Sequence, residues 1–564
     1  MTSSYRILTR AGYVDAMPIA FRPLTTRLAS FRVIRVVTMA LGTATGAVDA
    51  QPSPRLPLGD AAYVELDQLV GSGLVRTVMY GQRPFTRREV TRIVADASRA
   101  AERRTVSDAT RRVLDRLRRR FQVRPDADSA SAAPYYASVE TVQLQSPARA
   151  IARAPVGDVA ADLNPLLNGR GGRWYSQGMT LSAEGGGAWS LGRRVTLQLA
   201  PRIAAGRNAN SGERFAMLSL QDASVSISGA NLVLDVGRQP LAWGQGMDGG
   251  LMLSSSGRPL DMIRVSTDRP WRAPWVFKWL GLLRGTAFIA DLGPRQNFPN
   301  AKIAAYKLSG QVTSYFELAA QVLVHQGGRG APPASLVDRF VDLVPALQYS
   351  LPRKNTTQFS NKLAGWEERV RIPQLHGLQL YAEHAFDDMD PRRWRSTLWE
   401  DAGHIVGASL AQIGPAGAYS LATEFHHTGL RFYRHTPFVS GLAFDGVLLG
   451  DPLGPQGDGG TIRLRYDAGR RQSWQVDATV ERRGGDVWGT TSDSPADERF
   501  RFVLLRAQPA EWRTRTMLRW AFLATPVQRL SLEAGMERVR DAGFIRGARR
   551  TNTVAAAQWS WSAW

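Results

Sequence analysis

Apolar and polar residues alternate along many short segments of the chain after residue 135. In residues 316–324, 462–466, 474–480 and 530–536, every second residue is apolar. The residues between them are mainly charged, small or Gln. A period of two is typical of β-strands with one apolar and one polar face. About 18 such segments are present, and either a soluble sandwich or a transmembrane barrel can be built from them. The pattern therefore predicts an all-β region over residues 135–564.

Three further features favour a membrane barrel over a sandwich. The chain begins with residues typical of an export signal, the segments are numerous, and many end in aromatic residues. The 16 Trp and 14 Tyr of the chain suit the aromatic girdles at membrane interfaces. Lipid offers no water to unpaired backbone groups, so such a sheet has to close. We expect an all-β transmembrane fold, a closed antiparallel outer-membrane β-barrel of about 18 strands.

Residues 1–50 are predicted to be a signal peptide that is removed on export. Arg22, Arg27, Arg32 and Arg35 precede the apolar run of residues 36–48, and Val48-Asp49-Ala50 places small residues at the cleavage-like positions. A buried N-terminal helix is the alternative interpretation. With the signal removed, the predicted location is the cell outer membrane.

Residues 51–134 are predicted to form a periplasmic α-helical region followed by a linker. Tyr63, Leu66 and Leu69 recur at helical spacing. Thr86 is expected to cap a second helix, with Glu89 completing a capping box. A third helix is expected to begin near residue 107, and the Ala/Ser/Asp/Pro-rich residues 123–134 indicate the linker. An independent soluble domain is an equally supported alternative.

Composition limits the possible partners and sites. The chain has no Cys, so disulfides and thiolate metal sites are excluded. Its net charge of +22 is compatible with nucleic acid, anionic lipid or an acidic polymer. The one dense basic run, residues 111–120, has the spacing of a solvated helix face, so nucleic acid is not expected.

Residues 236–263 interrupt the strand pattern with a dense run of Gly, Pro and Ser. We interpret this stretch as an ordered loop or kinked insert between two barrel strands. Gly244, Gly246 and Gly249 match the G-x-G-x-x-G motif, but a dinucleotide site needs a helix opening at the third glycine. No amphipathic helix fits the residues that follow. The nucleotide interpretation is therefore disfavoured.

The same stretch carries a family resemblance. A strand ending in Gly237-Arg238, then Trp-Gly-Gln-Gly at residues 243–246, then a Leu- and Ser-rich run with Pro-Leu, resembles the Wzi-type capsule assembly proteins. Further blocks at residues 324–330, 381–390, 424–428 and 450–455 resemble that family in the same order. The resemblance spans most of residues 60–564. It implies an outer-membrane barrel that assembles capsular or extracellular polysaccharide or attaches it to the cell surface, without catalysis.

The chain ends in Gln-Trp-Ser-Trp-Ser-Ala-Trp, residues 558–564. This aromatic end resembles the terminal signal that outer-membrane barrels present to their insertion machinery, although Trp564 has the opposite parity to Trp559 and Trp561. Outer-membrane lipids and that machinery are therefore expected partners.

No catalytic residue, cofactor or metal site is predicted. Asp387, Asp388 and Asp390 lack the spacing of a calcium loop. His426 and His427 lack zinc-site spacing, and strand alternation places them on opposite faces. A porin, or a barrel hydrolase joining Ser and His across strands, remains an alternative function.

Three residues of the insert are candidates for contact with an anionic polysaccharide. Arg238 and Arg258 offer guanidinium groups, and Trp243 offers a stacking surface for a sugar ring. They lie among glycines, where a ligand can approach the backbone closely. The alternative is that these side chains pack the insert inside the barrel.

Overall fold

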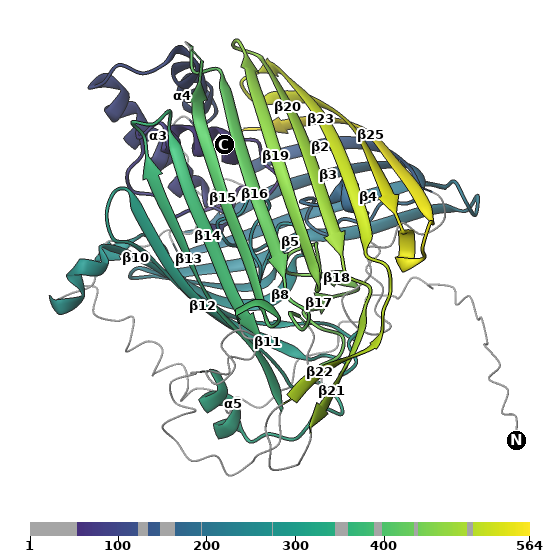
Figure 1. Cartoon of the computed structure of the whole chain (residues 1–564). Coiled ribbons are helices and arrows are strands. Elements are labelled where there is room, and N and C mark those ends of the chain that lie inside the picture. Colours follow the sequence, from purple (N-terminus) through teal and green to yellow (C-terminus); the bar gives the residue numbers. More distant parts are fainter. Residues whose placement is uncertain are drawn as a thin grey trace, which may run out of the picture. The chain divides into compact units, whose positions relative to one another are not determined.

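Strands between residues 133 and 562 close into one antiparallel barrel (Figure 1). The computed structural model describes residues 53–121, 133–146 and 164–563, except 193, 273–274, 344–358, 388–397, 415, 434–437 and 493–499. The predicted signal peptide and most of the predicted linker lie outside the described residues. The boundaries predicted for the three regions therefore stay predictions.

The barrel has 18 strands, as the alternation predicted, because β9 continues β8 along the same edge of β10. Every neighbouring pair is antiparallel. The strands are β2 (Ala133–Gln145), β3 (Gly178–Leu191), β4 (Val195–Asn208), β5 (Arg214–Gly229), β6 (Leu232–Gln239), β8 (Leu260–Thr267) with β9 (Trp271–Arg272), β10 (Leu282–Asp291), β11 (Lys302–Gln311), β12 (Phe316–Gln326), β13 (Ser360–Ile372), β14 (Leu378–Asp387), β15 (Ala402–Ile413), β16 (Tyr419–Thr428), β19 (Gly457–Ala468), β20 (Gln472–Arg483), β23 (Glu511–Thr525), β24 (Gln528–Arg540) and β25 (Arg549–Ser562).

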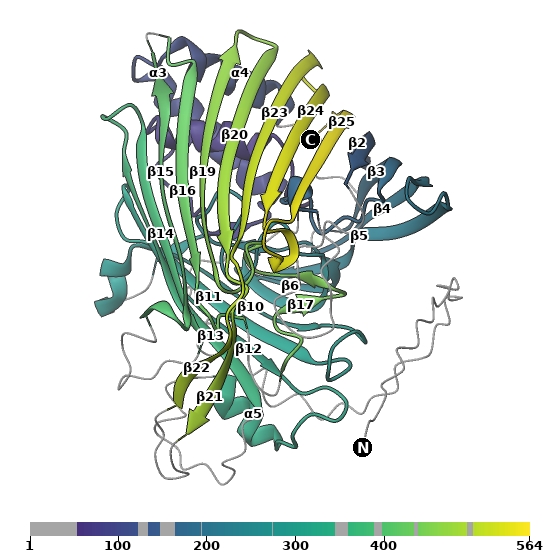
Figure 2. The ribbon, with the colours of Figure 1, turned by 45° about the vertical axis from the view of Figure 1, so that its right-hand side comes forward.

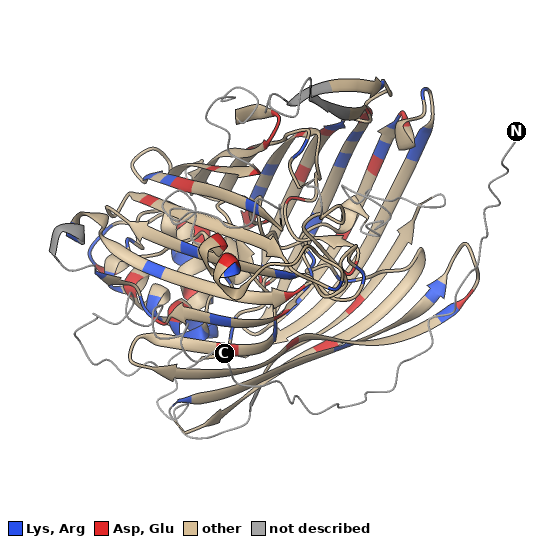
Figure 3. Cartoon of the chain, turned by 90° about the horizontal axis from the view of Figure 1, so that it is seen from below, with Lys and Arg blue, Asp and Glu red and all other residues tan. Residues whose placement is uncertain are grey.

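The outer wall of the barrel is apolar and the inner wall is polar, the reverse of a soluble protein. On β19, Ile462 is 55% exposed on the outside, whereas Arg465 is buried toward the lumen. On β20, Val480 is exposed and Glu481 is buried. Figure 3 shows the charged residues spaced along the strands among uncharged ones. An apolar outer band with a polar interior is what a barrel surrounded by lipid requires.

The last strand closes the barrel against the first. β25 pairs with β2 along ten residue pairs, among them Trp559 with Val139 and Trp561 with Ala137. Trp559 is exposed on the outer wall. Trp564 lies outside the described residues, so its predicted parity is not tested.

Deleting residues 559–564 is expected to abolish barrel assembly. The deletion removes part of the ladder that joins β25 to β2 and leaves unpaired backbone groups in lipid. The measurement is heat-modifiable migration of the outer-membrane fraction on a gel. The matched control is Trp559→Phe/Trp561→Phe, which keeps the backbone and aromatic rings and should assemble. Normal assembly of the truncated chain would contradict the closure.

Three amphipathic helices precede the barrel, as predicted: α2 (Ala62–Gly71), α3 (Arg87–Glu102) and α4 (Asp108–Arg120). The Thr86 hydroxyl caps α3 by accepting a hydrogen bond from the Glu89 backbone N–H at 3.2 Å. The predicted capping box is only half formed, because the Glu89 carboxylate pairs with Arg92 at 2.7 Å. The apolar faces of the helices form a common buried core. None of the helices in the described part of the chain is long and apolar enough to cross a membrane.

The helical region packs against the inner wall at one end of the barrel. Figures 1 and 2 show the purple helices near the turn between β15 and β16, and the Ala109 backbone N–H donates to the Ala416 carbonyl in that turn at 3.2 Å. The strand connections at this end are short, as in β19–β20 and β23–β24. Short turns face the periplasm in outer-membrane barrels, so this end is periplasmic. The longer connections, such as residues 429–456, lie at the extracellular end.

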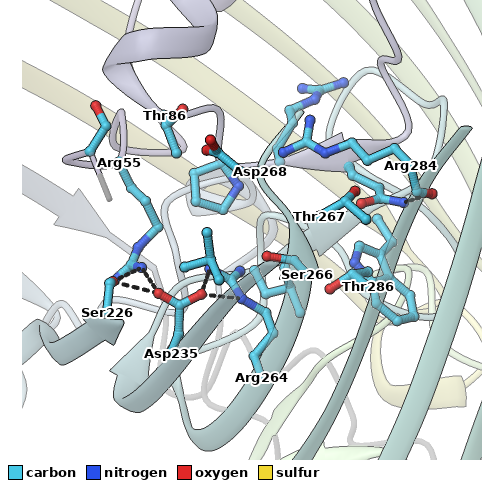
Figure 4. Close-up of a pocket in the computed structure, with 17 residues that line it drawn as sticks. Arg55, Thr86, Ser226, Asp235, Arg264, Ser266, Thr267, Asp268, Arg284 and Thr286 are labelled. Atoms are coloured by element: carbon cyan, nitrogen blue, oxygen red, sulfur yellow. Dashed lines mark hydrogen bonds and ion pairs between the residues drawn. The ribbon is translucent and has the colours of Figure 1, made fainter. Parts of the chain in front are cut away.

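Buried ion pairs fix the helical region to the wall. The Arg55 guanidinium lies 3.0 Å from Asp222. It also lies 2.9 Å from Asp235, which pairs with Arg264 at 2.9 Å (Figure 4). Burial lowers the pKa of Arg55, but the two aspartates raise it by more, so its pKa lies above the ordinary value. Arg55 therefore stays charged and joins the segment before α2 to β5 and β6.

Arg55→Ala is expected to destabilise the docked helical region by about 3–5 kcal/mol, because it leaves Asp222 without its buried partner. Limited proteolysis of the folded barrel should then cut the helical region at lower protease concentration. The control is Arg104→Ala, which removes an equal charge from an exposed position between α3 and α4. Equal protease resistance of both variants would contradict the anchoring role.

Candidate functional site

The insert between β6 and β8, residues 240–259, folds into the lumen. Its short strand β7 (Ala242–Trp243) pairs with β1 (Gln82–Arg83) of the N-terminal region. The Gln245 amide donates to Glu317 at 3.2 Å and to Glu367 at 3.1 Å on the inner wall. The ordered insert that the sequence predicted is therefore confirmed, and the insert and the N-terminal region share the interior.

Wall carboxylates hold the backbone of the insert. The Met247 N–H donates to Glu424 at 2.8 Å, and the Leu251 N–H donates to Glu383 at 3.0 Å. At Gly250 a Cβ atom would lie 2.3 Å from the Glu383 carboxylate, so this position accepts only glycine without movement of the wall. Within the G-x-G-x-x-G run, a Cβ atom at Gly244 would lie 2.5 Å from the same carboxylate, so this glycine also allows close approach to the wall. Residues 244–259, all described, contain no helix, and the dinucleotide interpretation fails.

Behind the insert the wall is a network of buried charges. Lys307 forms an ion pair with Glu367 in which both side chains are fully buried. Arg371 pairs with Glu317 at 2.6 Å, and Arg369 donates to the Gln245 side-chain oxygen at 2.7 Å. Breaking a buried pair by removing one partner costs about 3–5 kcal/mol, so this network keeps the insert in place.

Trp243 lies within this packing and is 1% exposed. Its ring stands edge-on to Phe288 at 5.4 Å, and the Lys307 ammonium lies 5.8 Å from the ring centre. In this position the ring offers no face to a sugar. The position of Trp243 fits the alternative interpretation, in which its side chain packs the insert inside the barrel.

Arg238 and Arg258 lie apart from Trp243. Arg238 has the outward parity of Val236 on β6, and its guanidinium pairs with Asp261 of β8 at 2.6 Å. Arg258 lies at the end of the insert, is partly exposed and pairs with Asp445. The structure does not bring the three predicted residues together into one site.

The extracellular mouth of the lumen contains a second arginine beside Arg258. Arg295, in the β10–β11 connection, lies 3.0 Å from Asp445, and its side chain is 58% exposed. Asp445 occupies the tip of a hairpin formed by β17 (Ala443–Phe444) and β18 (Val447–Leu448). Asp445 and Gly446 both have positive φ, as a two-residue hairpin turn requires. We call Arg258, Arg295 and Asp445 the mouth cluster.

Sequence reasoning did not find Arg295. The Asp-Gly dipeptide at 445–446 is a hairpin signal, but no local pattern shows that this hairpin meets residues 258 and 295. What joins them is the shared carboxylate of Asp445.

A polar cavity of about 390 Å³ lies beside the insert and the helices. Asp248 and Ser255 of the insert line it on one side, and Arg463 and Arg519 of the wall line it on the other. Arg463 donates to Asp477 at 2.9 Å. The alternation of residues 462–466 had already placed Arg463 on a polar face, so the sequence contained a signal for this lining. The cavity can hold water or polar groups of a ligand.

The two neighbouring histidines of β16, His426 and His427, each contact acidic residues. His426 faces inward between Asp451 and Glu424, 2.7 Å from the latter, whereas His427 faces outward and contacts Asp458 at 2.8 Å. The two histidines therefore lie on opposite faces, as predicted. Asp388 and Asp390 lie outside the described residues. Within the described part of the chain, no group of three or more His, Asp or Glu is arranged to hold a metal ion.

Comparison with known proteins agrees with this architecture. The model of the capsule assembly protein Wzi family matches residues 148–553. The solved structure of Wzi from Escherichia coli, an outer-membrane protein involved in group 1 capsule assembly and a carbohydrate-binding β-barrel, is 16% identical with a TM-score of 0.61; the match covers 90% of this chain and 99% of that one.

Pseudomonas aeruginosa OccD3 is 9% identical with a TM-score of 0.43, and the match covers 77% of this chain and 94% of that one. No curated protein matches the chain. The family match extends over most of the barrel and includes the insert. The chain is thus an outer-membrane β-barrel that belongs to the Wzi family of capsule assembly proteins.

Proposed function

We propose that this protein binds capsular or extracellular polysaccharide at the cell surface and retains it there without cleaving it. Membership of the Wzi family supports this function, as does the carbohydrate binding of the Escherichia coli protein. The observation that carries the proposal is the mouth cluster, in which Arg258 and Arg295 meet at Asp445 at the extracellular end. The Arg295 side chain is more than half exposed there, so its guanidinium group is accessible to an anionic polymer.

The geometry of the mouth cluster suits retention of a polymer. A guanidinium group offers paired hydrogen bonds to carboxylate, phosphate or sulfate. One exposed contact of this kind contributes on the order of 1 kcal/mol or less. A repeating polymer engages several barrels at once, so weak contacts add to firm attachment. Arg258 keeps its predicted role in this proposal, with Arg295 as its neighbour, while Arg238 and Trp243 stabilise the wall and the insert.

The filled lumen argues against the porin alternative. The insert is bound to the wall by Glu383, Glu424 and Gln245, and the helical region occupies the periplasmic end. A polymer or solute would have to displace both. The observed interior therefore favours surface binding over conduction.

The arrangement of Ser and His side chains supports a function without catalysis. The Ser254 hydroxyl donates to the Gly450 carbonyl at 2.6 Å and is buried. His426 is occupied by Asp451 and Glu424. A hydrolase needs a nucleophile within hydrogen-bond reach of its base, and these two groups have other partners. The apolar outer wall supports outer-membrane lipids as further partners, and contact with insertion machinery stays a prediction.

Arg258→Ala/Arg295→Ala is expected to weaken binding of polygalacturonate by about tenfold at low salt, since it removes both guanidinium groups of the mouth cluster. Binding to purified barrels is measured by surface plasmon resonance at rising salt. Wild-type affinity should fall as salt rises, because the contacts are between exposed charges.

The matched control is Arg546→Ala/Arg549→Ala, which removes two charges from exposed positions at the same end of the barrel. This control should bind polygalacturonate as the wild type does. Unchanged binding by a folded Arg258→Ala/Arg295→Ala variant, or equal loss in the control, would contradict the mouth cluster as the contact site.

A further inference from the structure

A small pocket lies at the periplasmic end of the lumen, far along the strands from the mouth cluster. Register places four inward-facing residues in one row across neighbouring strands: Arg465 on β19, Gln475 on β20, Arg519 on β23 and Glu533 on β24. Arg529, the second residue of β24, lines the same pocket beside the short β23–β24 turn. The pocket is thus part of the wall's regular geometry.

Among the described residues, two guanidinium groups of this pocket have no acidic partner in an ion pair. Arg465 is 8% exposed, its side chain makes no hydrogen bond or ion pair with any described residue, and its buried Nε–H has no acceptor. Arg529 donates only to the Ser531 hydroxyl, at 3.2 Å, in the part of the chain that the structure describes. The pocket therefore carries excess positive charge.

The nearby carboxylates are already engaged. Among the described residues, each one pairs with an arginine other than Arg465 or Arg529. Asp467 and Glu65 pair with Arg116, Asp60 with Arg120, Asp477 with Arg463 and Arg519, and Glu533 with Arg170. Glu533 is the one carboxylate among the pocket's lining residues. Glu533 forms ion pairs with Arg170 at 2.5 Å and with Arg519 at 3.7 Å. It therefore does not neutralise Arg465 or Arg529.

A buried charge is costly unless it is paired and hydrogen-bonded. Ser473 and Ser531 add neutral hydroxyl donors to the same lining, and hydroxyl donors can complete the coordination of an oxyanion. The pocket has a volume of about 60 Å³ and shares six of its lining residues with the 390 Å³ cavity. It has room for one small anionic group, with the remainder of a larger ligand lying in the cavity.

We propose that Arg465 and Arg529 form a luminal oxyanion site that takes a phosphate or carboxylate group at the periplasmic end of the lumen. The planar guanidinium fork matches both groups. The site is distinct from the mouth cluster and does not depend on it. A ligand here would reach the barrel from the side on which newly exported molecules arrive.

The test is equilibrium dialysis of radiolabelled inorganic phosphate against the purified full-length mature barrel at fixed ionic strength. Wild type should bind one phosphate per barrel. Arg465→Gln/Arg529→Gln should bind it at least about tenfold more weakly, because two charge-assisted contacts are lost. Arg529→Gln alone, at the half-buried rim of the pocket, should also weaken binding and provides a second variant if Arg465→Gln prevents assembly.

The matched control is Arg538→Gln/Arg540→Gln, which removes two exposed charges from the outer face of β24. It should bind phosphate as the wild type does. Absence of saturable phosphate binding by wild type, unchanged affinity in either pocket variant, or equal loss in the control would overturn the proposal.

Parallel dialysis with glucose 6-phosphate and glucuronate identifies the source of the anion. Binding of these sugars as well as phosphate supports an anionic substituent of a saccharide, while binding of phosphate alone supports a free anion. Neutral glucose that binds as tightly as glucose 6-phosphate would overturn recognition of charge. Polygalacturonate binding through the mouth cluster is measured separately, so the two proposals can fail independently.

Discussion

Lipid offers no hydrogen bonds to a backbone, and the rest of this structure depends on that constraint. The β25–β2 ladder satisfies it by joining the end of the chain to residues that follow the helical region. Closure then forces every second side chain inward, where polar and charged residues collect. A closed wall of this kind needs an interior that can pair its charges.

The N-terminal region and the insert supply those pairs. Arg55 and Arg116 bring cations to wall aspartates, while the wall brings Glu383 and Glu424 to the backbone of the insert. The N-terminal region and the insert are therefore bonded to the barrel wall and do not form a separate domain inside it. Charges of the wall pair with charges of the N-terminal region, while Arg465 and Arg529 of the periplasmic pocket have no ion pair with any described residue.

Much of this fold could be predicted from sequence, because alternation reports directly on which face a side chain takes. The strands, the Thr86 cap and the insert followed from local pattern. Alternation also places Arg238 on the face of Leu234 and Val236, the outer one, so Arg238 does not share the buried position of Trp243. The meeting of Arg258, Asp445 and Arg295 depends on three separate connections, and no local pattern reports such tertiary contacts.

The position of the insert determines whether one ligand can reach both ends of the lumen. The mouth cluster lies at its extracellular end, whereas Asp248 and Ser255 face the cavity that leads to Arg465 and Arg529. For one polymer to touch both ends, the insert would have to break its hydrogen bonds to the wall carboxylates. These are Glu383 and Glu424, which hold its backbone, and Glu317 and Glu367, which hold the Gln245 side chain. These contacts are buried or partly buried, and the carboxylates would lose a hydrogen bond each, at a cost of about 1–3 kcal/mol per bond. With the insert in place, the two ends bind separate ligands, or separate parts of a ligand that does not pass through the barrel.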